Sequence, residues 1–137
     1  MTAVKRTKGA SARIKGAAGE RELFGLLSDE LGMVVRRQLG ASRDGGADGL
    51  DVPGWCIEVK RTETLALNAF WGQAVRQAAA AGLRPVLFHR ASRRQWAAYV
   101  DPADIAPSMF GRFGGPVAMP LPRWCELARS LLSGISA

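Results

Sequence analysis

The chain has 137 residues, with 19 Lys and Arg against 12 Asp and Glu, which leaves a formal net charge of +7 at pH 7. This length fits one domain with a substantial core and excludes two full catalytic domains. The excess of basic residues favours a polyanionic partner, with nucleic acid the leading one. No apolar run approaches the roughly 18 to 20 residues that span a bilayer, so no membrane partner is expected.

The first 15 residues are basic and contain no acid. We interpret residues 1–15 as a flexible basic arm that binds a polyanion; the alternative is a solvated tail without a role. The segment has no apolar core, so it is not a secretory signal peptide. Its basic residues are Lys5, Arg6, Lys8, Arg13 and Lys15.

A helix is predicted over residues 16–31, where Leu23, Leu27 and Leu31 recur at helical spacing and Gly32 follows as a C-terminal cap. Val34 and its neighbour predict a strand over residues 33–38. A glycine-rich, basic loop follows this strand.

A hairpin is predicted next, with one arm over residues 48–52, a Pro-Gly turn, and a second arm over residues 55–61. Successive side chains of a strand point to opposite faces. Trp55, Ile57 and Val59 should therefore share one face of the second arm. The opposite face should carry Cys56, Glu58 and Lys60.

The second half of the chain continues with alternating elements, and residues 16–137 are expected to form a single domain with a C-terminal helix. A helix should begin near Asn68, as N-cap, and end at Gly82. The tryptophans have apolar neighbours, which favours core or interface packing over base stacking. The remaining predicted elements are strands over 85–90 and 95–100, an irregular loop over 101–122 and a helix over 123–132.

Cysteine and histidine usage limits the chemistry. Cys56 and Cys125 are the only cysteines and have neither zinc-site nor disulfide-framework spacing, so a reduced, cytoplasmic protein is expected. His89 is the only histidine, which excludes nuclease sites that need one His as base and another as ligand. Any metal must be held by oxygen ligands.

Carboxylates form the candidate site. Glu20 precedes Leu23 and Leu27 by three and seven residues, so it lies on the apolar stripe of the first helix, where an unpaired charge is costly. The alternative is a partly buried helix-start carboxylate favoured by the macrodipole. The hairpin adds Asp48 or Asp51, and the residues alone leave that choice open. Together with Glu58 these acids predict a Mg²⁺ site, with Mn²⁺ as a substitute.

Lys60 completes this predicted site. Its ammonium would orient or help deprotonate an attacking water and offset charge on a scissile phosphate. We expect nearby basic residues to bind phosphates, and each such contact steepens the salt dependence of affinity. These expected nucleic-acid contacts are Lys15, Arg36, Arg37, Arg43 and Arg61, with Ser42 in the same loop as Arg43.

The motifs "KGAAGEREL", "RRQLGASRDGGAD", "IEVKR", "WGQAVRQA" and "RPVLF" occur in this order between Lys15 and Phe88. In this stretch, more than half of the chain, the sequence resembles the PD-(D/E)XK nucleases, and among them Holliday-junction resolvases and related phage-type endonucleases. The family's usual proline before the aspartate is replaced by Ala47. The glycine-rich entry "GGAD" favours Asp48 over Asp51 as the family's aspartate.

This resemblance implies an α/β fold, a restriction-endonuclease-like mixed β-sheet flanked by helices with an α-β-β-β-α-β core. It implies Glu20 as the helix-borne acid, Asp48 and Glu58 as metal ligands and Lys60 as catalytic lysine, with Gln73 as a supporting polar residue. It also implies a homodimer, branched duplex DNA as substrate, 5′-phosphate product ends, and the host cytoplasm as location if a phage encodes the chain.

The function predicted from sequence is a Mg²⁺-dependent endodeoxyribonuclease of the junction-resolving kind. One alternative is a restriction-like or nicking phage nuclease, because fold alone does not separate these activities. Another is a non-catalytic nucleic-acid-binding module with structural acids. A serine or tyrosine recombinase is not expected, since the chain has one Tyr and one His and no activated nucleophile is evident.

Overall fold

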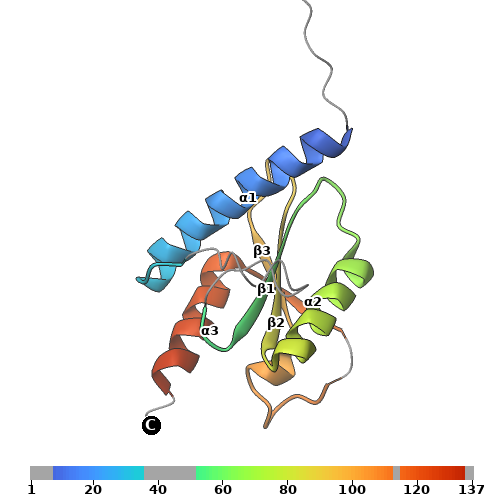
Figure 1. Cartoon of the computed structure of the whole chain (residues 1–137). Coiled ribbons are helices and arrows are strands. Elements are labelled where there is room, and N and C mark those ends of the chain that lie inside the picture. Colours follow the sequence, from blue (N-terminus) through green and yellow to red (C-terminus); the bar gives the residue numbers. More distant parts are fainter. Residues whose placement is uncertain (1–7, 36–51, 113–114, 135–137) are drawn as a thin grey trace, which may run out of the picture.

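The structure, a computed structural model, describes residues 8–35, 52–112 and 115–134. Within these ranges a four-stranded sheet lies between helices α1 (Lys8–Leu31) and α3 (Leu121–Gly134) on one side and α2 (Leu67–Ala81) on the other (Figure 1). None of the described helices is long and apolar enough to cross a bilayer.

The sheet has the order β1-β2-β3-β4. Strands β1 (Trp55–Arg61) and β2 (Arg84–Arg90) are parallel, because α2 carries the chain back across the sheet between them. Strands β3 (Ala97–Val100) and β4 (Val117–Pro120) continue the sheet in antiparallel pairings. The described residues therefore form the predicted class of fold, a mixed α/β sheet flanked by helices.

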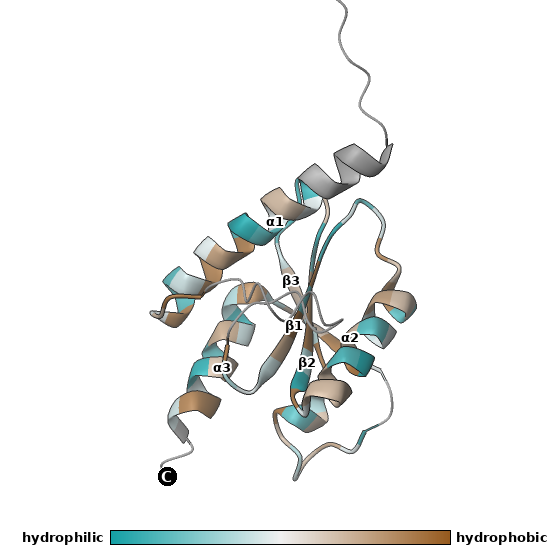
Figure 2. Cartoon of the chain, in the orientation of Figure 1, coloured by the Kyte–Doolittle hydropathy of each residue, from teal (hydrophilic) through white to brown (hydrophobic). Residues whose placement is uncertain are grey.

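The main core lies between the sheet and helices α1 and α3. Trp124 of α3 packs edge-on against Trp55 of β1 and Phe88 of β2, with ring centroids 5.3 and 5.0 Å apart. Leu23 and Leu27 of α1 are completely buried in the same cluster. In Figure 2 the middle of the sheet is mostly brown, whereas the chain leaving β1 toward α2 is teal. Hydrophobic burial therefore holds the sheet, and polar residues gather at the end of β1.

A smaller apolar cluster lies on the opposite face, under α2. It contains Trp71 and Ala74 of α2 and Leu87 of β2. The side chains of all four tryptophans are buried, which confirms their predicted packing role. Gly82 ends α2 with a φ of 69°, the left-handed conformation typical of a glycine cap, as predicted. The helix begins one residue before Asn68, and its N-cap is Ala66, so the expected Asn68 cap is wrong.

Helix α1 begins at Lys8, earlier than the predicted start at residue 16, so residues 8–15 of the expected flexible arm have helical backbone. The segment has no proline and contains several strong helix formers, Ala, Arg and Lys, which permits this extension. Residues 1–7 lie outside the described part of the chain.

The strand predicted over residues 33–38 is not formed by Met33, Val34 and Val35, and its other residues lie outside the described ranges. The backbone amide of Val35 donates to the Ser28 hydroxyl at 3.0 Å, so it turns back to α1. Val34 is 69% exposed. In the predicted hairpin the second arm is β1 as expected, Val52 carries no strand, and residues 48–51 are not described.

The segment 101–122, expected to be an irregular loop, contains the 3₁₀ turn η2 (Pro102–Asp104) and strand β4. Most side chains of β4 are exposed, so the strand lacks the apolar alternation that would predict it. Its proline is the last strand residue, where a lost backbone donor is tolerated. Helix α3 then starts at Leu121, two residues earlier than predicted, with Pro122 in its first turn.

Candidate active site

The face of β1 that looks toward α2 carries the central pair of the candidate site. Trp55, Ile57 and Val59 belong to the main core on the other face, which confirms the predicted sidedness of this strand. Glu58 and Lys60 consequently point away from that core, and the Lys60 Nζ lies 3.2 Å from Glu58 Oε1. The alternation of side chains along the strand thus places the Glu58 carboxylate and the Lys60 ammonium on one face.

Glu58 is a buried acid, with 1% of its surface exposed. A carboxylate in such a place needs compensating partners, because removing a charge from water costs several kcal/mol. The ammonium of Lys60 supplies one of them, and 25% of the Lys60 side chain remains exposed. The same ammonium lies 5.2 Å from the centroid of the Phe70 ring on α2. Lys60 is therefore held between a carboxylate and an aromatic face while still reaching solvent.

A polar row next to this pair involves the single histidine. His89 of β2 lies opposite Lys60 in the parallel register, and its ring centroid is 6.5 Å from that of Phe70. Its Nε2 lies 2.9 Å from the carbonyl oxygen and 3.1 Å from the hydroxyl of Thr62. Burial lowers the pKa of His89, so the neutral imidazole is favoured. The neutral His89 thus hydrogen-bonds to Thr62, the first residue after β1.

Helix α1 crosses the end of β1 at very short range. A Cβ atom placed on Gly19 would lie 2.7 Å from the Cβ and 2.9 Å from the Cγ of Arg61. Lys15, one turn earlier, forms an ion pair with Glu63 in the loop after β1. The half-buried Glu20 follows Gly19 directly. The second glycine of "KGAAGEREL", Gly19, has no role in the sequence analysis, and it permits the contact that brings this part of α1 to the strand.

Glu63 ties three segments together. Besides Lys15 it accepts hydrogen bonds from the backbone amide and the hydroxyl of Ser92, in the turn between β2 and β3. The bonds from Lys15 and then Ser92 lower the pKa of Glu63 to about 2. Arg61 adds bonds to Glu63 and to the Ser92 hydroxyl, and only 12% of its side chain is exposed. Most of its guanidinium is thus directed into the protein.

Glu22 makes a second connection between α1 and the sheet. Arg90 donates to both of its carboxylate oxygens, at 2.8 and 3.3 Å, and the Trp96 indole donates to one at 2.6 Å. The bond from Arg90 is the main cause of the lowered pKa of Glu22. Sequence reasoning missed Glu22 and Glu63, since both look like ordinary exposed acids and their partners are distant in the chain.

Several predicted site residues lie outside the described residues. They are Arg36, Arg37, Ser42, Arg43, Asp48 and Asp51. Gln73 is described and is half-buried on α2. Among the described residues no group of three or more His, Cys, Asp or Glu side chains is arranged to hold a metal. The structure therefore brings Glu58 and Lys60 together, brings α1 to the end of β1, and does not describe the hairpin aspartates.

The chemistry of the described donors fits a hard cation. Glu58 is a buried carboxylate, and its oxygens are the kind of ligand that Mg²⁺ prefers. The two cysteines are buried within the core elements β1 and α3. On this face of β1, Glu58 would supply one oxygen ligand to such a cation.

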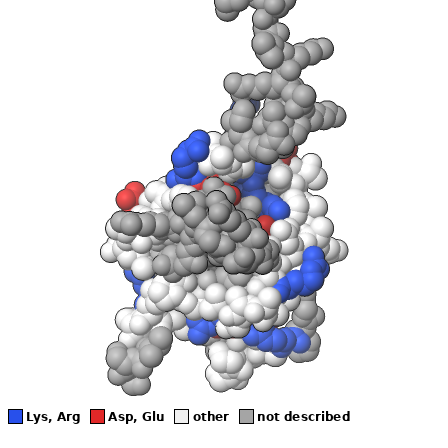
Figure 3. All heavy atoms as spheres, in the orientation of Figure 1, with Lys and Arg blue, Asp and Glu red and all other residues white. Residues whose placement is uncertain are grey.

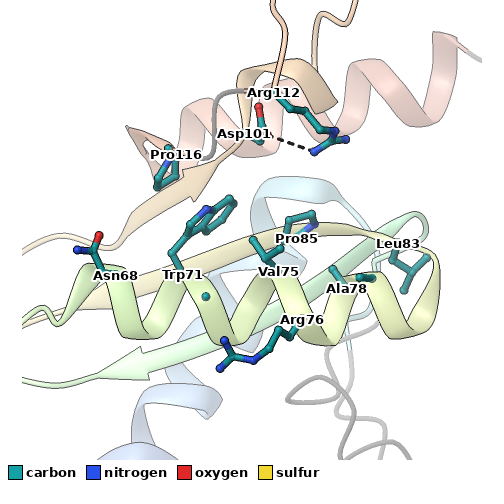
Figure 4. A pocket seen from close by; sticks show the side chains of 13 residues that line it. Asn68, Trp71, Val75, Arg76, Ala78, Leu83, Pro85, Asp101, Arg112 and Pro116 are labelled. Carbon is teal, nitrogen blue, oxygen red and sulfur yellow. Dashed lines mark hydrogen bonds and ion pairs between the residues drawn. The ribbon is translucent and has the colours of Figure 1, made fainter.

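A separate cavity of about 680 Å³ lies between α2 and the residues Asp101, Arg112, Gly115 and Pro116. Figure 4 shows Trp71 and Val75 of α2 on one side of it and the ion pair of Asp101 with Arg112 on the other. Neither Glu58 nor Lys60 lines this cavity. It is therefore distinct from the candidate site.

The sheet carries a Glu-X-Lys pair on the strand before a crossover helix, as the sequence resemblance to PD-(D/E)XK nucleases implies. A family model matches residues 11–109, and it is described as "Phage putative PDDEXK endonuclease". The match covers more than half of the chain, so the chain belongs to this family.

The comparison with solved structures finds Hjc from Archaeoglobus fulgidus, a Holliday junction resolvase, at 19% sequence identity and a TM-score of 0.46. The similarity covers 88% of this chain and 96% of that chain. No curated protein matches the chain significantly.

Proposed function

We propose that this chain is a metal-dependent endonuclease that hydrolyses phosphodiester bonds of DNA. The observation that carries the proposal is the buried Glu58 with Lys60 beside it on one strand face, 3.2 Å apart, in a chain of a PD-(D/E)XK endonuclease family. The net charge of +7 is consistent with a polyanionic substrate.

The described residues suggest distinct roles for the pair. Lys60 keeps a quarter of its side chain exposed, so its ammonium can contact a scissile phosphate and offset the negative charge that develops there. Phe70 and Glu58 limit where that ammonium can point. This orientation in advance of substrate binding reduces the entropy lost in reaching the transition state.

We assign the metal to Glu58 together with Asp48, with Asp51 as the alternative and Glu20 as a further ligand. Mg²⁺ held there, or Mn²⁺ in its place, supplies Lewis acidity at the scissile phosphate and a source of activated water. Gln73 would support this set from α2, where it is half-buried. Exposed basic groups would hold the flanking phosphates.

The proposed substrate is branched duplex DNA, following the sequence resemblance to junction resolvases. Symmetric nicks in a four-way junction require two active sites related by a two-fold axis, so the active species would be a homodimer. Gel filtration measures the oligomeric state. Cleavage of a synthetic four-way junction against a linear duplex of the same sequence measures the preference, and equal rates on both would reject junction specificity while leaving the nuclease intact.

The central test compares the wild type with Glu58→Gln and a matched control, Glu126→Gln, in the presence of Mg²⁺. Glu126 lies on the surface of α3 in an exposed ion pair with Arg123, so its amide variant makes the same chemical change away from the site. We expect Glu58→Gln to lose cleavage by about 100-fold or more, typical for loss of a central catalytic group, and the control to cut normally. Equal cleavage by all three proteins would overturn the proposed site.

A further inference from the structure

The turn between β2 and β3, residues 91–96, leaves the sheet at the same end as the candidate site. Lys60 lies opposite His89 and Arg61 opposite Arg90, so the turn begins immediately beyond this row. Arg93 follows His89 by four positions, a span of at most about 14 Å when the chain is extended. DNA carries one charge per roughly 3.4 Å of axis on each strand, so this reach corresponds to only a few nucleotides.

The turn is fastened from three directions. Glu63, after β1, accepts hydrogen bonds from the amide and hydroxyl of Ser92. Arg90 donates to the carbonyl oxygens of Ala91 and Arg94 at 3.1 and 3.4 Å. Glu22 on α1 holds Trp96 at the far end of the turn. Such a set of bonds restricts the turn and keeps its remaining side chains in a defined place.

Two arginines of this turn, Arg93 and Arg94, take no part through their side chains in the hydrogen bonds that hold the turn in place. Arg93 and Arg94 are exposed, and no described residue forms a hydrogen bond or an ion pair with either guanidinium. The neighbouring acids Glu22 and Glu63 are already bonded to Arg90 and Lys15. The turn consequently presents two uncompensated positive charges beside the candidate site.

Arg93 also has a strained backbone. Its φ is 63°, the only positive value among the described residues other than glycine. An L-residue in this region costs roughly 1–2 kcal/mol, and such outliers gather at binding and catalytic sites. A glycine would remove this cost. An arginine held here presents a guanidinium whose planar donors match phosphate oxygens.

We propose that Arg93 and Arg94 bind backbone phosphates of the DNA close to the cleaved bond. This inference rests on the proposed nuclease function and adds a contact that fixes where the strand lies against Glu58 and Lys60. Figure 3 shows Lys and Arg atoms gathered with carboxylates just below the beginning of α1. The two exposed arginines of the β2–β3 turn add positive charge beside the candidate site.

The test measures DNA affinity of the full chain as a function of salt, without divalent metal so that no cleavage occurs. The variants are Arg93→Gly, Arg94→Ala and the control Arg123→Ala, which removes an equal charge from α3. Losing one phosphate contact should make the slope of log K against log salt less steep by about 0.9 for each turn variant. The control should keep the wild-type slope.

Arg93→Gly separates binding from folding, because glycine adopts a φ of 63° without strain. We expect this variant to be at least as stable as the wild type in urea while binding DNA more weakly. If the wild type binds and cuts DNA but both turn variants keep the wild-type slope of log K against log salt, the phosphate contacts of the turn are overturned and the nuclease function is not. If the wild type neither binds nor cuts the four-way junction or the linear duplex, both the proposed function and this inference are overturned.

Discussion

Replacing Gly19 by alanine tests how closely α1 packs on the end of β1. The added Cβ would lie 2.7 Å from Arg61 Cβ and 2.9 Å from its Cγ. Optimal carbon contacts lie at about 3.5–4.0 Å, so the helix or the strand must move. Both contacted atoms lie at the base of the Arg61 side chain, which leaves little freedom for the side chain alone to turn away. A Cβ added at Gly25 in the same helix would meet no atom within 4 Å, so Gly25 serves as the matched control.

The magnitude follows from two opposing effects. Alanine is favoured over glycine in a helix interior by about 1 kcal/mol, and this gain applies to both positions. Overpacking a close contact costs about 1–3 kcal/mol, and this cost applies only to Gly19. Gly19→Ala should therefore be less stable than Gly25→Ala by about 1–3 kcal/mol, because the propensity gain cancels in the comparison.

Urea unfolding followed by tryptophan fluorescence measures the free energy of unfolding of both variants, and the four buried tryptophans supply the signal. Cleavage assays on the same proteins test the consequence for the site. A displaced α1 moves Lys15 and Glu20 relative to β1, so Gly19→Ala should also cut DNA more slowly than Gly25→Ala. Equal stability and equal cleavage in the two variants would refute the packing argument.

Three further predictions concern single side chains. Lys60→Ala should lose cleavage by about 100-fold or more and keep its affinity for DNA, and an active variant in the cleavage assay would remove Lys60 from the proposed chemistry. The pKa of Glu63 is lowered from 4.5 to about 2, so its stabilisation should be complete above pH 4.5 and lost as the pH falls toward 2. Urea unfolding across this window should show a shallower pH dependence for Glu63→Gln, and an unchanged profile would contradict the bonding of Glu63. Burial raises the pKa of the Cys125 thiol to about 12, so this thiol should resist a disulfide reagent at pH 8 until the protein is unfolded, and rapid labelling of the native chain at Cys125 would disagree.

Local patterns predicted much of the architecture because they depend on neighbours in the chain. The alternation over residues 55–61 predicted both β1 and its two faces, and the glycine at position 82 predicted the end of α2. Strand β4 was missed, since its exposed side chains carry no periodic apolar signal and the strand exists through its pairing with β3. The expected strand after α1 failed where Val35 bonds back to Ser28.

The candidate site also has parts that local spacing predicts and parts that depend on tertiary packing. Glu58 and Lys60 are two residues apart, so strand geometry alone puts them on one face, and their proximity was predictable. The burial of Glu58, and the position of the Phe70 ring beside Lys60, depend on how distant segments pack. The hairpin aspartates lie outside the described residues, and their predicted role as metal ligands stays a prediction.

The sequence by itself determined the strand carrying Glu-X-Lys, the helices around it and the class of chemistry, because each depends on residue type and short spacing. The tertiary structure decided how α1 meets β1 at Gly19 and how Glu22 reaches Arg90, 68 residues away. It also decided which arginines are bonded internally and which face solvent on the β2–β3 turn. Such contacts arise only when distant segments pack together, and no local spacing encodes them.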